Sequence, residues 1–365
     1  MSEWQTFCLK DLGKIVGGAT PPTNNPKNYG NKIAWITPKD LSTLQGRYIK
    51  KGSRSISRLG FKSCSCVLLP KHAILFSSRA PIGYVAIAEK RLCTNQDFKS
   101  IIPNKKIYFE FLYYLLKYHK NNLINMGEGT TIKGIYNIAL GLFKVKIPPT
   151  YYEQQKIART LSILDQKIEN NHKINELLHT LAYKIYEYYF KYKPKNAKLE
   201  QIIIENPKSN IMVKNAQKTQ DKYPFFTSGD NILSYPKAII DGRNCFLNTG
   251  GNAGIKFYVG KASYSTDTWC ICANEFSDYL YLLLSSIKNH INQSFFQGTS
   301  LKHLQKICLK KYPIYMPSVH EIKKFNQIIM PLLTLISINT RTSKKLEQIR
   351  DFLLPLLLKQ QVKSK

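Results

Sequence analysis

The feature that most constrains this chain is a long stretch, residues 150–190, that contains neither proline nor glycine. Apolar residues recur along it at spacings that alternate between four and three residues. This pattern is typical of the seam of a coiled coil, in which one apolar stripe of a helix packs against a partner helix. The predicted seam consists of Ile157, Leu161, Leu164, Ile168, Asn171, Leu178 and Ile185.

The same pattern occurs again near the C-terminus, in a register that pairs Ile157 with Phe325. A long helix with a single apolar stripe is not stable alone, so we expect each helix to be the partner of the other. Asn171 and Asn339 occupy equivalent seam positions, where they either fix the register of the helices or face a partner subunit or water. Pro331 lies inside the second helix and is expected to kink it. The second seam consists of Phe325, Ile329, Leu332, Ile336, Asn339, Leu346 and Leu353.

The segments that precede the two helices also repeat. The first two motifs of the first half, at 33–40 and 77–83, lie farther apart than their equivalents in the second half, at 223–230 and 248–254. The first half therefore contains an insertion between these two motifs. We assign this insertion to the basic stretch 47–58. The repeat is too long for a solenoid unit and predicts a duplicated domain, each copy followed by a long helix. The repeated pairs are 33–40 with 223–230, 77–83 with 248–254, and 127–135 with 297–304.

The charge of the chain is strongly positive. Among 365 residues, 54 are Lys or Arg and 23 are Asp or Glu, which gives a formal net charge of +31. This balance favours a polyanionic partner, nucleic acid before a membrane surface, although a Lys-rich codon bias contributes to its size. No apolar run reaches the roughly 18 residues that a membrane span needs, and the N-terminus lacks a signal peptide. The eight Cys show no metal-ligand spacing, so we expect buried free thiols in a reducing cytoplasm.

The pattern of apolar runs predicts a mixed α/β (α+β) fold with two similar globular domains. We place the first domain at residues 1–149, the first helix at 150–192, the second domain at 193–317 and the second helix at 318–362. In the first domain we expect strands at 33–36, 65–70, 73–76, 83–88 and 138–147, and a helix at 108–122. In the second domain we expect strands at 244–247, 255–259 and 269–272, and a helix at 278–293.

Motifs for catalysis are missing from the sequence. The glycine-rich segment 250–256 lacks the Gly-Lys-Ser/Thr ending of a phosphate-binding loop. The tripeptide Glu321-Ile-Lys323 matches part of a nuclease signature, but we interpret Glu321 as a first-turn acid of the second helix. The chain is therefore predicted to bind rather than to catalyse. An enzyme with an unrecognised motif is the alternative, and S-adenosylmethionine binding or DNA cleavage by the purified chain would support it.

Polar, glycine-containing loops are the candidate DNA-binding elements of each half. Glycine allows close backbone approach, hydroxyl groups suit phosphate oxygens, and Arg and Asn can read base edges. For the loops at 129 and 298, a purely architectural turn is an equal alternative. Arg79 is the strongest single candidate of the first half. The candidate DNA-binding residues are Lys39, Arg54, Arg58, Ser78, Arg79, Thr130, Thr131, Lys133, Thr227, Ser228, Asn248, Asn252, Thr299, Ser300 and Lys302.

Several of these motifs resemble those of one family, the specificity subunits of type I restriction–modification systems. The most specific motif is Pro148-Pro-Thr-Tyr-Tyr-Glu-Gln-Gln-Lys-Ile-Ala, which opens the first helix. In the second half the equivalent segment, Val319-His-Glu-Ile, departs from this form. The other matching segments are Trp35-Ile-Thr-Pro-Lys-Asp-Leu, Ser78-Arg-Ala-Pro-Ile-Gly and Gly127-Glu-Gly-Thr-Thr-Ile-Lys-Gly-Ile.

The resemblance implies two target recognition domains, each reading one half of a bipartite site on double-stranded DNA. It implies that the helices form an antiparallel pair with pseudo-twofold symmetry, which separates the domains and docks two methyltransferase subunits. Two restriction/translocase subunits can join such a complex. S-adenosylmethionine, ATP and Mg²⁺ are then expected in the partner subunits, and this chain is expected to bind no cofactor or metal and no membrane.

A helix of this length is consistent with that implication. At about 1.5 Å per residue it is roughly 55 Å long, which corresponds to on the order of 16 base pairs at about 3.4 Å each. Two alternatives remain at this point. One is a basic adaptor that binds DNA without sequence specificity, and the other is the recognition subunit of a fused methyltransferase–nuclease system.

Overall fold

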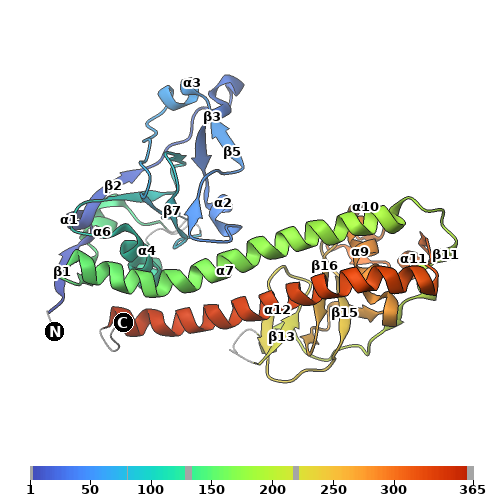
Figure 1. Cartoon of the computed structure of the whole chain (residues 1–365). Coiled ribbons are helices and arrows are strands. Elements are labelled where there is room, and N and C mark those ends of the chain that lie inside the picture. The colour runs from blue at the N-terminus through green and yellow to red at the C-terminus, as the bar shows by residue number, and fades with distance from the viewer. Residues whose placement is uncertain (1–2, 80, 128–133, 217–221, 360–365) are drawn as a thin grey trace. The chain divides into compact units, whose positions relative to one another are not determined.

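The computed structural model describes residues 3–79, 81–127, 134–216 and 222–359. The chain divides into two compact units. The first unit combines residues 1–169 with residues 346–365, and the second unit comprises residues 170–345. Each unit therefore contains one mixed α/β domain together with segments of both long helices (Figure 1). Within the described ranges, no helix is long and apolar enough to cross a membrane.

The first unit is built around a five-stranded sheet with the order β2-β9-β6-β7-β4. A three-stranded sheet, β5-β3-β8, carries the parallel pair β3 and β8, and β1 pairs with β10. The central strand β6 is antiparallel to both β7 and β9. The strands are β1 (Gln5–Cys8), β2 (Gly13–Gly17), β3 (Tyr29–Ile36), β4 (Tyr48–Ile49), β5 (Arg54–Ile56), β6 (Ile74–Phe76), β7 (Val85–Ala88), β8 (Cys93–Thr94), β9 (Lys99–Pro103) and β10 (Lys144–Ile147).

Helix α4 packs on strands β6 and β7 of the five-stranded sheet of the first unit. It is almost entirely buried because its run of Phe, Tyr and Leu lies between the sheet and the start of the first long helix. Burial of this apolar area is the main stabilising term for such a small domain. The short helices of this unit are α1 (Leu9–Leu12), η1 (Pro26–Asn28), α2 (Pro38–Ser42), α3 (Arg58–Lys62), α4 (Phe109–Tyr118), α5 (Lys120–Asn125) and α6 (Asn137–Leu142).

The second unit repeats this plan. Its four-stranded sheet has the order β12-β18-β15-β16, and its three-stranded sheet, β14-β13-β17, carries the parallel pair β13 and β17. The central strand β15 is antiparallel to β16 and β18, as β6 is to β7 and β9. The strands are β11 (Ala197–Lys198), β12 (Ile204–Glu205), β13 (Tyr223–Phe226), β14 (Leu233–Tyr235), β15 (Arg243–Asn248), β16 (Ile255–Val259), β17 (Ser263–Tyr264), β18 (Thr268–Cys272), β19 (Phe296–Gln297), β20 (His303–Leu304) and β21 (Pro313–Ile314).

Helix α9 of the second unit takes the place of α4. It packs on β15 and β16 and is buried through most of its length. The duplicated mixed α/β fold that the sequence predicts is thus confirmed at the level of sheet order and helix placement. The short helices of this unit are η3 (Leu199–Gln201), α8 (Val213–Ala216), η4 (Asn274–Phe276), α9 (Ser277–Ser286), α10 (Lys288–Ser294) and α11 (Lys306–Lys310).

The two long helices are α7 (Tyr151–Tyr186), which continues into a π-helical turn η2 (Glu187–Lys191), and α12 (Val319–Leu358). The helical assignment of α12 continues through Pro331 without interruption. The proline therefore does not end the helix, and a kink at this position stays a prediction. Pro331 is exposed, so its ring lies on the solvent side of the helix rather than against the core.

Some local predictions were wrong. Residues 138–147 do not form one strand, since they are divided between α6 and β10. A short apolar run does not distinguish helix from strand, and here Leu140 and Gly141 are buried while Ile138 and Leu142 are exposed, which is not a strand alternation. Residues 65–70 form only an isolated bridge at Leu69.

Two further predictions need correction. The helix expected at 108–122 is divided into α4 and α5, and the helix expected at 278–293 into α9 and α10. All eight cysteines are free, but they are not uniformly buried, because Cys308 is exposed.

Candidate nucleic-acid interface and helix pair

The structure brings the two polar loops of the first unit together. The backbone N–H of Ile135 donates to the carbonyl of Ser78 at 2.8 Å, and Arg79 forms an isolated bridge with Gly134. A third segment joins them, because the N–H and the hydroxyl of Ser78 both donate to the carbonyl of Asp97, at 2.7 and 3.0 Å. Arg79 itself is exposed beside this junction.

The second unit contains the same junction at equivalent positions. The N–H of Leu304 donates to the carbonyl of Thr249 at 3.0 Å. The N–H and hydroxyl of Thr249 both donate to the carbonyl of Asp267, at 3.2 and 2.6 Å. The N–H of Gly251 donates to the carbonyl of Lys302 at 2.9 Å, which fixes the two loops side by side. The loops that repeat in the sequence therefore form one repeated structure.

Eight of the predicted DNA-binding side chains are exposed. In the first unit, Lys39 lies on α2, Arg54 on the edge strand β5, and Arg58 at the first residue of α3. These positions leave the side chains available for a ligand, and DNA contact by them stays a prediction. The exposed candidates are Lys39, Arg54, Arg58, Arg79, Asn252, Thr299, Ser300 and Lys302.

Other predicted DNA-binding side chains are used inside the domains. Ser78 is fully buried, and Thr227 and Asn248 are each only 6% exposed. The amide of Asn248 donates to the carbonyl of Asn252 at 3.1 Å and accepts from Lys256, whose ammonium also bonds the carbonyl of Thr227. Direct DNA contact by these three side chains does not fit this burial, since polar residues in such loops can serve the turn itself.

Ser228 and Lys256 complete this internal network. The half-buried hydroxyl of Ser228 donates to the carbonyl of Asp267 and accepts from the N–H of Thr249 at 3.2 Å. Burial lowers the pKa of Lys256, the cation beneath the loop. Ser228 is thus also bonded within the domain. Thr130, Thr131 and Lys133, the remaining predicted contacts, lie outside the described residues.

A carboxylate positions the basic segment of the first unit. Asp40 accepts from the N–H of Ser53 at 2.7 Å and from the N–H and hydroxyl of Thr37 at 2.8 and 2.7 Å. Burial opposes the charge of Asp40, but the hydrogen bonds from Ser53 and Thr37 outweigh it and lower the pKa. Asp40 therefore holds the residue that precedes the exposed Arg54.

The helices run antiparallel in the second unit, as the polar pairs between them show. Asn171 donates to the hydroxyl of Ser343 at 3.1 Å, and Asn339 donates to the side-chain oxygen of Asn175 at 2.9 Å. The two pairs are related by the duplication. Asn171 and Asn339 therefore contact residues opposite them rather than each other. Thr340 lies within 3.4 Å of the Asn175 amide and completes the polar layer.

The seam residues of the second unit are buried to different extents. Phe325, Ile329 and Ile336 are buried, whereas Leu178, Ile185 and Leu332 are partly buried against the same core. The sequence pattern missed other deeply buried residues on these segments, because the apolar face next to the domain is wider than a coiled-coil seam. These missed residues are Tyr186, Phe190 and Leu333.

The seam of the first unit packs against the C-terminal end of α12. Ile157, Leu161 and Ile168 are buried, while Leu164, Leu346 and Leu353 are half-buried. Leu354, Leu357 and Leu358 form the buried face of α12 here. The sequence pattern selects Leu357 but not Leu354 or Leu358.

An ion pair crosses the helices within this first unit. Arg350 donates to Asp165 at 2.7 Å, and the hydroxyl of Tyr114 donates to the other carboxylate oxygen at 2.6 Å. Burial opposes the charge of Arg350, but Asp165 raises its pKa. The sequence pattern places Arg350 in the seam of the second helix but does not identify Asp165 as its partner, because nothing local relates residues so far apart in the chain.

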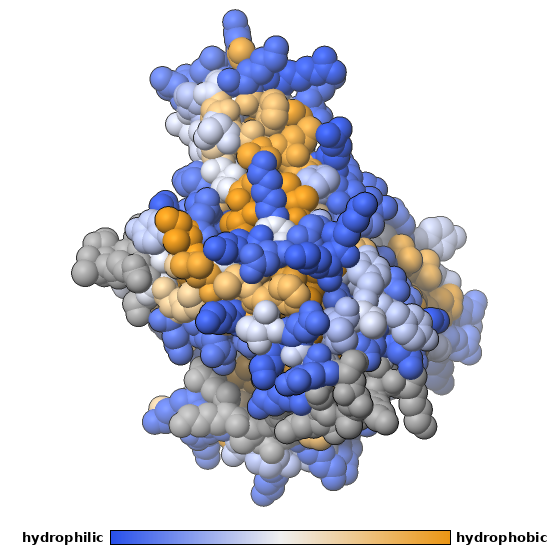
Figure 2. Space-filling view, turned by 90° about the vertical axis from the view of Figure 1, so that its left-hand side faces the viewer, coloured by the Kyte–Doolittle hydropathy of each residue, from blue (hydrophilic) through white to orange (hydrophobic). Residues whose placement is uncertain are grey.

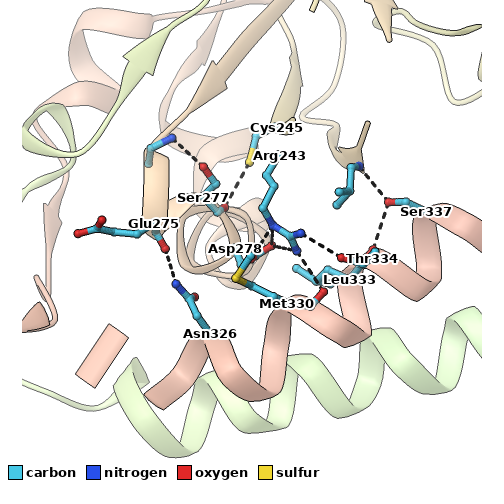
Figure 3. Close-up of polar contacts among 12 residues, drawn as sticks. Arg243, Cys245, Glu275, Ser277, Asp278, Asn326, Met330, Leu333, Thr334 and Ser337 are labelled. Atoms are coloured by element: carbon cyan, nitrogen blue, oxygen red, sulfur yellow. Dashed lines mark hydrogen bonds and ion pairs between the residues drawn. The ribbon is translucent and has the colours of Figure 1, made fainter. Parts of the chain in front are cut away.

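The sequence pattern also missed an arginine in each unit that is bonded inside the fold, buried in the first unit and partly buried in the second. In the second unit, the Nε and Nη2 atoms of Arg243 donate to both oxygens of Asp278 at 2.8–3.0 Å, and Nη1 donates to Thr334 at 3.0 Å (Figure 3). In the first unit, Arg47 donates to Glu110 at 3.0 Å and to Glu169 at 3.1 Å. We call these two clusters the arginine clamps.

The face drawn in Figure 2 is covered mainly by hydrophilic residues, and hydrophobic residues gather near its centre. No group of three or more His, Cys, Asp or Glu residues that could hold a metal ion occurs in the described parts of the chain.

Comparison with known proteins agrees with this picture. The family described as "Type I restriction modification DNA specificity domain" matches residues 1–180 and 195–348. The type I restriction enzyme MjaIX specificity subunit of Methanocaldococcus jannaschii is 30% identical over 98% of this chain and 93% of its own length. A putative type I specificity subunit of Mycoplasma genitalium is 24% identical over 73% of this chain and 70% of its own length.

The fold is also found in a solved structure. A crystal structure of the type I restriction–modification system S subunit from M. genitalium superposes with a TM-score of 0.62. The alignment covers 97% of this chain and 96% of that chain at 17% identity. The chain therefore belongs to the family of type I restriction–modification DNA specificity subunits.

Proposed function

We propose that this specificity subunit reads a bipartite DNA site, one half with each unit, and that its helix pair docks two methyltransferase subunits. The observation that carries the proposal is the repeated loop junction, at Ser78 and Ile135 in the first unit and at Thr249 and Leu304 in the second. Two equivalent surfaces on one chain suit two half-sites. The net charge of +31 supplies the attraction to phosphate.

The exposed apolar residues of the helices support the docking of partners. Leu181 on α7 is 49% exposed, and Ile349 on α12 is 47% exposed. The register that pairs Ile157 with Phe325 also pairs Leu181 with Ile349, so the duplication makes the two positions equivalent. Exposed apolar side chains at equivalent positions are typical of two like contacts with protein partners.

The catalytic chemistry belongs to the partners in this proposal. The methyltransferase subunits would hold S-adenosylmethionine and methylate adenine, and the restriction subunits, where present, would use ATP and Mg²⁺. The chain itself is proposed to be non-catalytic and to work in the cytoplasm, where the DNA lies. Purified without partners, it should transfer no methyl group from labelled S-adenosylmethionine to DNA.

A base-resolution map of adenine methylation, with and without the gene, tests the recognition role. Loss of one bipartite motif with a fixed gap is the expected result. A motif with a single uninterrupted block would contradict the two-unit assignment. Duplex competition at fixed salt separates this role from that of a nonspecific adaptor, which would bind all duplexes equally.

Docking is tested on the two equivalent apolar residues. Leu181→Asp and Ile349→Asp should each remove one methyltransferase subunit, and the double variant should remove both. The mass of the complex isolated from cells gives the readout. Leu59→Asp is the matched control. Leu59 is 50% exposed on the short helix α3, and it belongs to neither of the two long helices. An unchanged mass for the double variant would contradict the docking site.

A further inference from the structure

The two arginine clamps hold each domain to its own helix segment. Arg243 joins three elements of the second unit: it lies at the start of β15, binds Asp278 in the first turn of α9, and reaches Thr334 and the carbonyl of Met330 on α12 (Figure 3). The Met330 contact is 3.2 Å long. Each nitrogen of the guanidinium therefore has an acceptor, and its planar geometry fixes the direction of every bond.

The acid of this clamp is deeply buried. The side chain of Asp278 is 2% exposed and that of Arg243 is 17% exposed. Burial raises the pKa of Asp278, and the guanidinium of Arg243 opposes that shift. Well-packed apolar residues commonly replace a buried ion pair without loss of stability. The stability of the fold alone therefore does not explain why an ion pair, Arg243 with Asp278, joins the domain to α12.

The first unit contains a clamp of the same design. Arg47 is 3% exposed, donates through Nη1 to Glu110 in the first turn of α4, and donates through Nε and its backbone N–H to Glu169 on α7. Glu110 also accepts from the hydroxyls of Tyr48 and Tyr108, at 2.6 and 2.9 Å. Burial disfavours the charge of Arg47, but Tyr114, Glu169 and Glu110 raise its pKa.

The acids of the two clamps are equivalent, but the arginines are not. Glu110 and Asp278 occupy equivalent positions in the register that relates the two helix seams. Arg47 directly precedes β4, an edge strand that has no counterpart in the four-stranded sheet of the second unit as described. The predicted insertion at 47–58 is wrong in part, because β5 within it corresponds to β14. Arg243 instead lies at the start of β15, where His72 is its counterpart in the first half. The same joint of sheet, short helix and long helix is thus built in two different ways. Because the two arginines have different origins, duplication alone does not account for both clamps. Both units therefore point to a requirement for a joint whose hydrogen bonds have fixed directions.

From this geometry we infer that Arg243 and Arg47 are positioning residues that fix the angle of each recognition domain on its helix, and so set the allowed gap between the half-sites. The inference rests on the proposed reading of a bipartite site. A domain free to swivel on its helix would move its loops along the DNA, where one base pair is about 3.4 Å. The clamps would then control which gap is accepted, without touching DNA.

The test uses the full chain in its complex with the methyltransferase subunits. The substrates are duplexes with the half-sites at the native gap and at gaps one base pair shorter and longer. In Arg243→Met/Asp278→Leu, apolar side chains keep the joint buried and remove its directed bonds. We expect this variant to keep a cooperative unfolding transition and to methylate the native gap, while its preference over the neighbouring gaps falls at least tenfold. Arg243→Lys keeps the charge but not the bidentate geometry. Its preference for the native gap should lie between that of the wild type and that of the double variant.

The surface pair Glu205 and Lys310 supplies a matched control. It joins β12 to α11 within the same unit, and both side chains are partly exposed. Glu205→Gln/Lys310→Met should leave the gap preference unchanged. A clamp variant that folds and keeps the wild-type gap preference would overturn the inference, and Arg243→Lys decides the matter if the double variant does not fold. Wild-type complex that methylates no bipartite site would instead refute the proposed function.

Discussion

Single side chains define where each long helix begins. Thr150 and Glu153 form a reciprocal cap at the start of α7. The backbone N–H of Glu153 donates to the hydroxyl of Thr150, and that hydroxyl donates to the carboxylate of Glu153, both at 3.2 Å. Ser318 and Glu321 repeat this arrangement at the start of α12, where the backbone N–H of Ser318 donates to Glu321 at 2.8 Å. The interpretation of Glu321 as a first-turn acid, made from the sequence, is confirmed. Such caps satisfy backbone donors that a helix cannot satisfy itself.

Glu321 predicts a dependence of stability on pH. Hydrogen bonds from Lys193 and from the backbone of Ser318 lower its pKa from 4.5 to about 2. Because the folded pKa lies below the ordinary one, the carboxylate stabilises the folded state above pH 4.5, and this contribution is lost as the pH falls toward about 2. Glu321→Gln should therefore lose free energy of unfolding at neutral pH and match the wild type near pH 2, as measured by urea unfolding. A difference that does not change with pH would contradict this assignment.

Arg79 predicts how the first half-site is read. Its exposed side chain lies beside the loop junction. Arg79→Ala should weaken binding to the bipartite site identified by the methylation map. The expected loss is about 1–3 kcal/mol, the range for a bidentate contact with a base, and unrelated duplexes should be affected much less. Fluorescence anisotropy at fixed salt measures both. Arg159→Ala, at an exposed arginine of α7, is the control. Equal weakening on all duplexes would reassign Arg79 to a phosphate contact.

Exposed cationic residues were easier to predict than buried polar ones. Lys39 and Arg54 are exposed, as expected of charges in polar surroundings. Ser78 and Asn248 were expected to be DNA contacts, but their partners, Asp97 and Lys256, come from other segments of the domains. A local pattern cannot show that a distant residue will satisfy a polar group, so burial of such groups depends on the assembled fold.

At the scale of elements, the helix seams were the most predictable part of the chain. A repeat of apolar residues at helical spacing determines which face of a helix is buried, whatever the partner. The short elements were less predictable. Residues 138–147 contain too few turns for the spacing to decide between helix and strand, and packing of α6 against α1 decides it. The arginine clamps could not be predicted, since Arg47 and Glu110 are brought together only by the sheet.

The polar layer between α7 and α12 predicts a coupled effect. Asn339→Leu should lower the free energy of unfolding by about 1–3 kcal/mol, because it leaves the Asn175 oxygen without its donor. Asn175→Leu/Asn339→Leu should regain most of this loss, since two apolar residues then face each other. Urea unfolding of the two single variants and the double variant gives the coupling energy. Additive losses would show that the two amides do not act as a pair.

At the scale of the whole molecule, the duplication is the organising feature. The first and second units share their sheet order and the loop junction, although their arginine clamps differ in origin. In the proposed function each unit reads one half-site, and this reading is expected to be modular because each unit has its own core. The recognition surface of one unit can then change without altering the other.

This modularity gives a direct prediction. Replacing residues 195–317 by the corresponding segment of another type I specificity subunit should change one half-site and leave the other half-site as it was. Methylome sequencing of cells that carry the chimaera reads both half-sites at once. A chimaera that retains the original segment, passed through the same cloning steps, controls for expression. A change in both half-sites would contradict independent reading.

The composition of the first unit has a consequence for biosynthesis. Residues 346–358 belong to this unit although they follow the whole second unit in the chain, and Leu354, Leu357 and Leu358 belong to the same core as Leu161. The first domain is therefore synthesised before the α12 segment that completes its core. A nascent chain released early, or one cut after residue 345, would be damaged most in the domain that was made first.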